Sequence, residues 1–188
     1  MQELWNAARS HVGQSLKHCT VDKLLLWRYD DHIGITVAKR FSGFAPTGWK
    51  VAAVDGSAPD VADSAWNAID GNPDTLWQMG SASAPHSLTV DMGSDRRIGG
   101  LSYLPRQDKS REGVIETYHF ETSVDGKSWV AAITDGRFDN IRNNPVLQEV
   151  VFAPVTARFF RFTALKDVEG GTAVSVATIS VLPVTMHW

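Results

Sequence analysis

The sequence predicts an all-β sandwich, and three observations lead to this prediction. Short segments rich in β-branched and aromatic residues follow one another along most of the chain. Residues that form turns, chiefly Gly, Pro and Asp, separate these segments. Beyond residue 45, no helical spacing of apolar residues intervenes between them. Short strands joined by turns, without helices between them, are typical of two packed antiparallel sheets.

The composition is that of a globular protein. The 188 residues suffice for one substantial domain with a buried core, and 43% of them are hydrophobic and 21% charged. A net charge of -3 argues against nucleic acid or an anionic membrane as a partner. The lone Cys19 excludes an internal disulfide. No run of about 20 apolar residues could span a membrane, and the first residues lack the pattern of a signal peptide.

An N-terminal extension precedes the predicted sandwich. Residues 2–17 are expected to form a helix, because six residues recur there at helical spacing, namely Leu4, Ala7, Ala8, His11, Val12 and Leu16. Two strand-like segments follow within residues 23–41, on either side of the Asp30–His32 cluster. The Gly- and Pro-rich stretch 43–49 indicates a boundary near residue 45. Residues 1–45 are therefore expected to be a short α/β extension of unknown role.

The strands of the sandwich are predicted from alternation and turn signals. Residues 86–93 alternate apolar with polar side chains, as a half-buried strand does. A polar turn at residues 94–97 is expected to end that strand, and residues 98–104 are expected to form the next one.

The later strands carry stronger signals. Residues 118–133 contain two β-rich runs joined around Asp125–Gly126, which predicts a hairpin. Residues 157–165 place Phe160 and Phe162 on one face of a strand, with Phe159 and Arg161 on the other. The segment SVATISVLPV, which ends at Val184, is expected to close the set.

Signatures of common catalytic sites are missing from the sequence. It contains no HExxH, GxSxG, P-loop or dinucleotide-binding motif. Cys19 could serve as a nucleophile, with His18 beside it, but we favour a structural thiol. The Asp30–His32 run could bind a metal, but adjacent residues point in different directions, so we favour a solvated turn. The chain is therefore expected to be non-catalytic.

The stretch AIDGNPDTLWQ, residues 68–78, combines turn formers with oxygen-bearing side chains. Asp70 and Thr75 can offer side-chain oxygens, and Asn67 and Asn72 can turn backbone carbonyls inward. Calcium takes about six to eight such hard oxygen ligands. The pattern is not that of an EF-hand. By themselves, these residues fit a calcium site and an Asx-rich surface turn equally well.

A second polar cluster occupies residues 103–113, YLPRQDKSREG. Its charged and amide residues are Arg106, Gln107, Asp108, Lys109, Arg111 and Glu112. A guanidinium with a nearby carboxylate and amide can hold sugar hydroxyls through charge-assisted hydrogen bonds. A solvated loop with a local ion pair is the alternative, and the residues by themselves favour it.

Six motifs occur in an order and spacing that resemble the F5/8 type C, or discoidin-like, domains. They are NAIDGNPDTLWQ, PHSLTVDMG, YLPRQD, VDGKSW, ARFFRFTAL and VATISV. More narrowly, they resemble the family 32 carbohydrate-binding modules attached to bacterial glycosidases and to galactose oxidase. The resemblance covers residues 46–184 and leaves 185–188 as a tail. It implies a galactose-binding-like jelly-roll β-sandwich with about eight main strands. Residues 136–152 also resemble the modules that follow the catalytic domain of bacterial α-L-fucosidases.

The resemblance implies a structural calcium ion, Ca2+, in the loop described above. By position, the implied ligands and their neighbour in the last strand are Asn67, Asp70, Asn72, Thr75, Ala177 and Thr178. Relatives often carry a Glu where this chain has Thr178. A hydroxyl is a poorer calcium ligand than a carboxylate, so a lower calcium affinity is expected.

The resemblance also implies a galactose site at one end of the sandwich. Arg106 takes the position of the sugar-binding arginine, and Glu112 that of a group accepting from sugar hydroxyls. Gln78 stands where relatives often carry a histidine, and Ser81 where some carry a stacking tryptophan. The loop KDVEGGTAVS offers no aromatic ring either, whereas stacking is a large part of sugar affinity. The two tryptophans beside the calcium loop, Trp66 and Trp77, are expected to lie in the core.

The leading hypothesis is a non-catalytic carbohydrate-binding module that recognises terminal galactose-like sugars. It would tether a catalytic glycosidase domain of the same parent protein to its glycan substrate. The chain would then be a mature form or a fragment of an extracellular or periplasmic bacterial protein. A structural accessory domain that binds no sugar is the alternative, favoured by the missing aromatic residues. A discoidin-type protein- or lipid-binding module ranks below both.

Overall fold

The computed structural model describes residues 21–29, 32–39, 43–55, 64–82, 85–108 and 110–184. The chain divides into two compact units, Met1–Ser42 and Gly43–Trp188. The helix predicted at residues 2–17, the thiol of Cys19 and the tail at 185–188 lie outside the described residues. Within the described part of the chain, no helix is long and apolar enough to cross a membrane.

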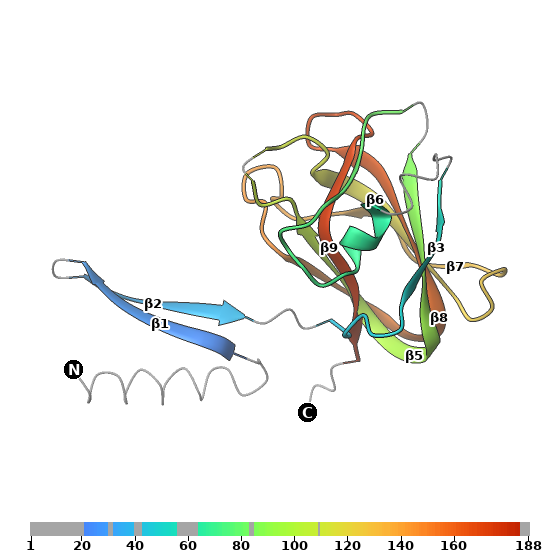
Figure 1. The fold of residues 1–188 in the computed structure, drawn as a ribbon, viewed down its shortest axis with the longest axis horizontal. Coiled ribbons are helices and arrows are strands. Elements are labelled where there is room, and N and C mark those ends of the chain that lie inside the picture. Colours follow the sequence, from blue (N-terminus) through green and yellow to red (C-terminus); the bar gives the residue numbers. More distant parts are fainter. Residues whose placement is uncertain are drawn as a thin grey trace. The chain divides into compact units, whose positions relative to one another are not determined.

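The first unit contains a β-hairpin. Strand β1 (Val21–Tyr29) pairs antiparallel with β2 (His32–Lys39), and Tyr29 lies opposite His32 where the strands are joined (Figure 1). The strand-like segments predicted on either side of the Asp30–His32 cluster are therefore present as a pair of strands.

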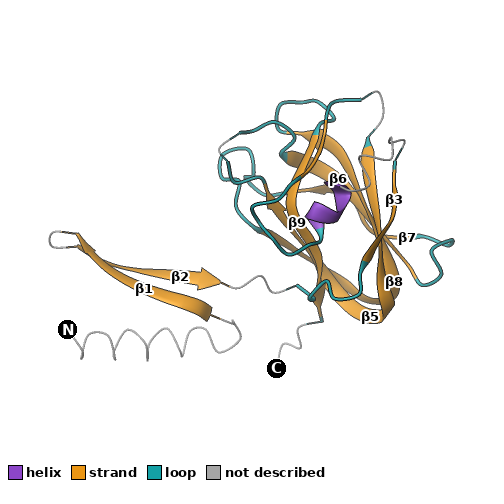
Figure 2. Ribbon diagram, viewed as in Figure 1, coloured by secondary structure: helices purple, strands orange, loops and turns teal. Residues whose placement is uncertain are grey.

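The second unit is built from antiparallel strands (Figure 2). The strand order is β4-β9-β5-β8-β6-β7, and β3 also pairs with β5. The bounds are β3 Lys50–Val54, β4 Trp77–Met79, β5 His86–Pro105, β6 Ile115–Ser123, β7 Val130–Arg137, β8 Gln148–Asp167 and β9 Val174–Pro183. A short 3-10 helix, η1 (Trp66–Ala68), precedes β4. This architecture confirms the predicted all-β class.

Two long strands curl the sheet around the core. Strands β5 and β8 have 20 residues each and pair along two stretches, 86–91 with 159–164 and 96–103 with 148–157. The first stretch continues through β8 to β6, whereas the second continues through β5 to β9. One hydrogen-bonded sheet therefore covers both sides of the core, as in a jelly-roll sandwich (Figure 1).

The polar segment at residues 94–97 does not form the predicted turn. Strand β5 runs through it, and its pairing with β8 shifts register between Asp91 and Arg96. Gly93 has a φ of 78° and donates its N–H to the Asp91 carboxylate at 2.8 Å. A bulge built on a left-handed glycine bends a strand without ending its ladder. Polar residues gather here because the bend is exposed, so the composition resembles that of a turn.

The predicted hairpin around Asp125–Gly126 is confirmed. Strands β6 and β7 pair antiparallel, and the loop between them is closed by the Asp125 carboxylate. This carboxylate accepts the N–H groups of Ser128 and Lys127, at 2.8 Å each. These bonds lower the pKa of Asp125 to about 2.

The faces predicted for β8 are also confirmed. Phe160 and Phe162 are fully buried, whereas Phe159 and Arg161 are partly exposed. The fully buried Trp77 agrees with the prediction, but Trp66 is 42% exposed, and its predicted place in the core is wrong. Other residues of this segment, Ala65, Ala68 and Ile69, are buried in its place. These three smaller side chains fill the core here, and the large indole of Trp66 lies partly outside it.

A buried tyrosine joins the strands that end beside the site described next. The Tyr103 hydroxyl donates to the Ser175 carbonyl and accepts the Ile115 N–H, at 3.1 Å each. The Tyr103 ring stacks on Phe138 with centroids 4.6 Å apart. Desolvation by burial raises the pKa of Tyr103 above its ordinary value. Through this one side chain, the end of β5 is held against the starts of β6 and β9.

Candidate functional site

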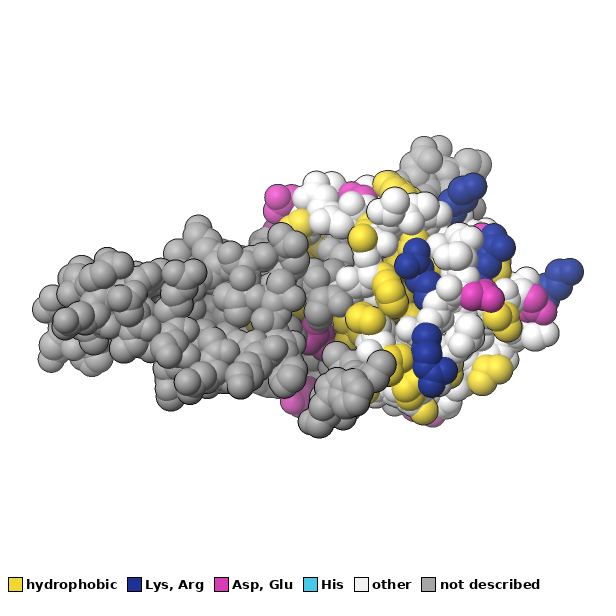
Figure 3. All heavy atoms as spheres, turned by 90° about the horizontal axis from the view of Figure 1, so that it is seen from below, with side chains coloured by type: hydrophobic (Ala, Val, Ile, Leu, Met, Phe, Trp, Pro, Cys, Tyr) yellow, Lys and Arg dark blue, Asp and Glu magenta, His cyan; other side chains and the backbone are white. Residues whose placement is uncertain are grey.

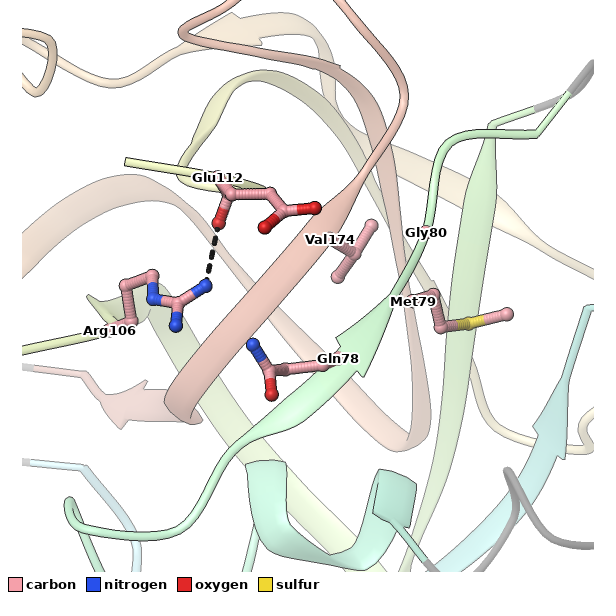
Figure 4. Close-up of a pocket in the computed structure, with 6 residues that line it drawn as sticks. All are labelled: Gln78, Met79, Gly80, Arg106, Glu112 and Val174. Atoms are coloured by element: carbon pink, nitrogen blue, oxygen red, sulfur yellow. Dashed lines mark hydrogen bonds between the residues drawn. The ribbon is translucent and has the colours of Figure 1, made fainter. Parts of the chain in front are cut away.

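A pocket of about 200 Å³ opens at this end of the sandwich. Its lining residues come from β4 and the loop after it, the β5–β6 connection and the start of β9, and they are Gln78, Met79, Gly80, Arg106, Glu112 and Val174 (Figure 4). The structure thus brings together all three residues that the sequence analysis assigned to a sugar site. Met79, Gly80 and Val174 were not predicted, because their contribution depends on the pairing of β4 with β9.

The guanidinium of Arg106 is held rigidly at the side of the pocket. Its Nε and Nη2 donate to the two carboxylate oxygens of Asp108 at 2.7 and 2.6 Å, and its Nη1 donates to the Glu112 carbonyl at 3.1 Å. The side chain is only 9% exposed. An arginine has five N–H donors, so two remain without a partner among the described residues. A donor group that is already ordered loses little entropy when it binds a ligand.

The arginine and its carboxylate partner shift each other's pKa. The hydrogen bonds from Arg106 lower the pKa of Asp108 to about 2, and those to Asp108 raise the pKa of Arg106. Both groups are therefore charged at neutral pH. The sequence shows the two residues side by side in one loop, but only the structure shows the two-pronged contact between them.

Glu112 and Gln78 complete the polar wall of the pocket. Among the six lining residues, Glu112 bonds only through its carbonyl, and its carboxylate extends over the pocket (Figure 4). The amide of Gln78 points toward the side on which Arg106 lies (Figure 4). The guanidinium supplies donors, the carboxylate supplies acceptors and the amide supplies both, and all three groups face one small space. This is the polar equipment for recognising a ligand rich in hydroxyl groups.

The apolar part of the pocket is small. Among its described lining residues, Val174 is buried, and the Met79 side chain points away from the three polar groups (Figure 4). Ser81 lies beside the β8–β9 loop, with its hydroxyl 3.0 Å from where a Cβ on Gly171 would be. Thr172 clips the same loops together, because its hydroxyl bonds to both the N–H and the carbonyl of Ala82. These two hydrogen-bonded loops are the ones in which the sequence has no aromatic residue to stack on a sugar.

A buried histidine, His86, holds the loop that forms part of the pocket wall. The Nε2 atom of His86 lies 2.8 Å from the Gly80 carbonyl, and its Nδ1 lies 3.1 Å from a carboxylate oxygen of Asp55. The ring therefore ties the pocket loop to the end of β3. The sequence offered no signal for this role, because His86 is simply the first residue of a strand.

The loop predicted to bind calcium is a compact cluster of oxygen atoms. Asp70 accepts the Asn72 N–H and the Thr75 hydroxyl, both at 2.7 Å. The Thr75 hydroxyl also lies 2.9 Å from the Asn72 carbonyl, and the Asn67 amide donates to the Leu76 carbonyl at 3.0 Å. Strand β9 contacts η1, and Trp77 pairs with Val176, so Ala177 and Thr178 lie close to this loop in the fold.

The donor set is compatible with a hard cation. The single proton of Thr75 cannot satisfy both the carboxylate of Asp70 and the carbonyl of Asn72. The described residues contain no cluster of three or more His, Cys, Asp or Glu side chains that could hold a metal. Any calcium here would therefore be held mainly by carbonyl and hydroxyl oxygens.

The sequence profile of the F5/8 type C domain matches residues 46–179. The chain belongs to the F5/8 type C domain family. This F5/8 type C domain is 34% identical over 120 residues to a sialidase from Micromonospora viridifaciens, a match of 61% of this chain and 18% of the sialidase. It is 30% identical over 133 residues to a galactose oxidase from Gibberella zeae, a match of 64% of this chain and 18% of the oxidase. The chain therefore spans only a small part of the length of these relatives.

Solved structures place the same F5/8 type C domain among carbohydrate-binding modules. CBM32-3 from a family 31 glycoside hydrolase from Clostridium perfringens matches with a TM-score of 0.66 and 25% identity, over 76% of this chain and 96% of that chain. CpGH89CBM32-5, from Clostridium perfringens and in complex with GalNAc-β-1,3-galactose, matches with a TM-score of 0.61 and 26% identity, over 75% and 99%. The predicted resemblance to F5/8 type C domains of the family 32 type is confirmed.

Proposed function

We propose that this domain is a non-catalytic module that binds glycans with a terminal galactose-like sugar. The observation that carries this proposal is the convergence of Gln78, Arg106 and Glu112 on one pocket of about 200 Å³. Such a volume lies below the roughly 300–1,000 Å³ of pockets for drug-sized ligands, which suits a single sugar residue.

The chemistry of recognition follows from the groups present. The free N–H groups of Arg106 would donate to hydroxyl oxygens of the sugar, and the Glu112 carboxylate would accept from its hydroxyl protons. Bonds to charged groups are the stronger kind. Gln78 can both donate and accept, so it discriminates less between hydroxyl orientations than the other two groups do.

The expected affinity is low, because the pocket offers little apolar surface. Aromatic stacking supplies much of the apolar contribution to sugar binding, and no aromatic residue lines this pocket in the described structure. Weak binding suits a module that works by tethering, since a linked second site raises the effective concentration of its partner. The partner would be a catalytic glycosidase domain of the same, extracellular or periplasmic, bacterial protein.

Calcium would serve this module as a structural ion. Asp70, Thr75 and the carbonyls of Asn67 and Asn72 would hold it, with the Ala177–Thr178 segment of β9 adjacent. Bound there, the ion would fix the η1–β4 loop that leads directly into Gln78. Its contribution would be rigidity of the pocket wall and not chemistry.

Calorimetric titration with methyl β-D-galactoside, in calcium-containing buffer, tests the sugar proposal. We expect heat from weak binding in the wild type and its loss in Arg106→Ala. Arg97→Ala is the matched control, because Arg97 is an exposed arginine of β5 that does not line the pocket. The absence of binding heat from the folded wild type up to tens of millimolar galactoside would overturn the proposal. It would favour the structural accessory domain, which the polar, ring-free pocket also fits.

A further inference from the structure

A second polar pocket has a volume of about 180 Å³. Its polar walls come from the start of β6, the end of β7 and the loop after β7, and they are Glu116, Arg137, Asn140, Arg142 and Asn143. We call it the arginine pocket. None of its residues belongs to the sugar site proposed above.

Two arginines converge there on one buried carboxylate. Arg137 Nη2 donates to Glu116 Oε1 at 2.6 Å, and Arg142 Nη2 donates to Glu116 Oε2 at 3.1 Å. The Glu116 side chain is 9% exposed, whereas Arg137 and Arg142 are 69% and 47% exposed. Desolvation alone would raise the pKa of Glu116, but the two arginines hold it below its ordinary value. The carboxylate therefore carries its charge at neutral pH.

The cluster keeps an excess of positive charge and of donors. One arginine is enough to neutralise a carboxylate in a bidentate pair. Here two guanidiniums share one acid, which leaves a net charge of about +1 among the charged residues of the pocket lining. Each guanidinium uses one of its five N–H groups on Glu116, so most of its donors have no partner among the described residues. Asp139 lies next to Asn140 in the chain but is not part of the lining.

The asparagine wall of the pocket is ordered before any ligand binds. Asn140 adopts a left-handed φ of 47°, and its carbonyl accepts the N–H groups of Asn143 and Asn144 at 3.0 and 2.9 Å. The Asn143 amide donates to the Asn140 side-chain oxygen at 2.9 Å. Among the described residues, the two N–H donors of the Asn140 side chain have no partner and can bind a ligand. A wall held in this way adds little ordering cost to binding.

We propose that the arginine pocket is a second glycan subsite, and that it binds the carboxylate of an acidic sugar. The planar fork of a guanidinium matches a carboxylate, and a ligand carboxylate would supply the second negative charge between the two arginines. The Asn140 and Asn143 amides would contact the hydroxyls of the same sugar. A sulfate ester carries the same charge, so the test below includes it.

The position of the arginine pocket would allow one glycan to contact both pockets. Glu112 of the first pocket and Glu116 of the second are four residues apart, so their Cα atoms lie within about 14 Å of each other. Gln107 donates to the Pro145 carbonyl at 3.1 Å and joins the two loops that carry the pockets. An oligosaccharide with a neutral terminal sugar and an acidic neighbour could therefore reach both.

Titration with sodium D-galacturonate, followed through backbone amide NMR shifts, tests the proposal. In the wild type, shifts are expected at residues 138–143, with weaker binding at higher salt. Arg137→Gln and Arg142→Gln are each expected to weaken this binding about tenfold. Either substitution leaves Glu116 paired with the other arginine, and the midpoint of urea unfolding checks that the fold is intact. Arg97→Gln removes the same charge elsewhere and is expected to change little.

Four results would overturn the proposal, and the last of them concerns only its assignment to a carboxylate. The first is the absence of shifts at 138–143 in the wild type up to tens of millimolar galacturonate. The second is equal binding of the neutral methyl ester of galacturonate, and the third is loss of binding in Arg106→Gln but in neither variant of the arginine pocket. Tighter binding of galactose 6-sulfate than of galacturonate would overturn the assignment to a carboxylate. Binding of the neutral galactoside is expected to shift the amide signals of residues 78–80. A failure of the first site would therefore be distinguished from a failure of the arginine pocket.

Discussion

At the scale of the residue, the proposed sugar site depends on how Arg106 is held. Asp108 takes both Nε and Nη2, and the same contact lowers the pKa of Asp108 to about 2. A carboxyl group with a depressed pKa stabilises the folded state above its unfolded pKa of about 3.9. That contribution is lost as the pH falls through about 2. The pair therefore stays charged throughout the range in which proteins of this type would meet a glycan.

Asp108→Asn is expected to weaken galactoside binding about two- to fivefold, because it removes the charge that orients Arg106 but leaves the arginine in place. Calorimetry at pH 7 measures the change. Asp95→Asn, an exposed aspartate at the β5 bulge, is the control and should bind as the wild type does. Unchanged binding in Asp108→Asn would show that Arg106 is ordered without its partner.

At the scale of the element, the β5–β6 connection serves both pockets. It carries Arg106 and Glu112 to the first pocket, and it leads into Glu116 of the second. Its course is set where it crosses β9. There, Gly113 has a φ of 72°, its carbonyl accepts the Ser175 N–H at 2.8 Å, and an added Cβ would meet the Val174 carbonyl carbon at 2.6 Å.

Gly113→Ala is expected to lower the free energy of unfolding by about 2–4 kcal/mol, through positive-φ strain together with a clash against rigid backbone. Gly48→Ala is the matched control. Gly48 has a φ of 81° but open space around a new Cβ, so only the strain remains, about 1–2 kcal/mol. Urea unfolding measures both variants. Equal losses would mean that the connection can move away from β9.

At the scale of the whole molecule, the two polar pockets are local clusters on a surface of mixed character. The Lys and Arg side chains on the described surface seen from below lie apart, among apolar, neutral and a few acidic ones (Figure 3). The net charge is -3, so no strong overall attraction to an anionic membrane is expected. Specific clusters, rather than overall charge, would therefore distinguish the proposed binding sites of this domain.

Calcium is expected to stabilise the whole domain if the oxygen cluster around Asp70 binds it. At a calcium concentration one hundred times the Kd, linkage adds about 2.7 kcal/mol, or roughly 5–10 °C in Tm for a domain of this size. Thermal unfolding with calcium or with a chelator measures the difference. Asp70→Asn should abolish it, whereas Asp74→Asn, a neighbour outside the proposed ligand set, should retain it. A wild type insensitive to the chelator would leave the loop a plain Asx turn.

Much of the fold could be predicted from local patterns. The alternation in residues 86–93, the two faces of β8 and the Asp125–Gly126 turn depend on neighbours in sequence, and all three are present. The prediction of a turn at 94–97 was wrong because bulges and turns both favour polar residues and glycine. The predicted burial of Trp66 was wrong because the side of a short 3-10 helix that is buried depends on the segments that pack against it.

By itself, the sequence determined the all-β class, the family resemblance and the types of residue that could hold a sugar or a calcium ion. Only the tertiary structure decided that Gln78, Arg106 and Glu112 line one pocket, and that Glu116 meets two arginines in another. The reason is physical. Residue type and local spacing act within a few positions, whereas both pockets form where loops distant in sequence meet. Strand pairing and the curl of β5 and β8 around the core bring those loops together.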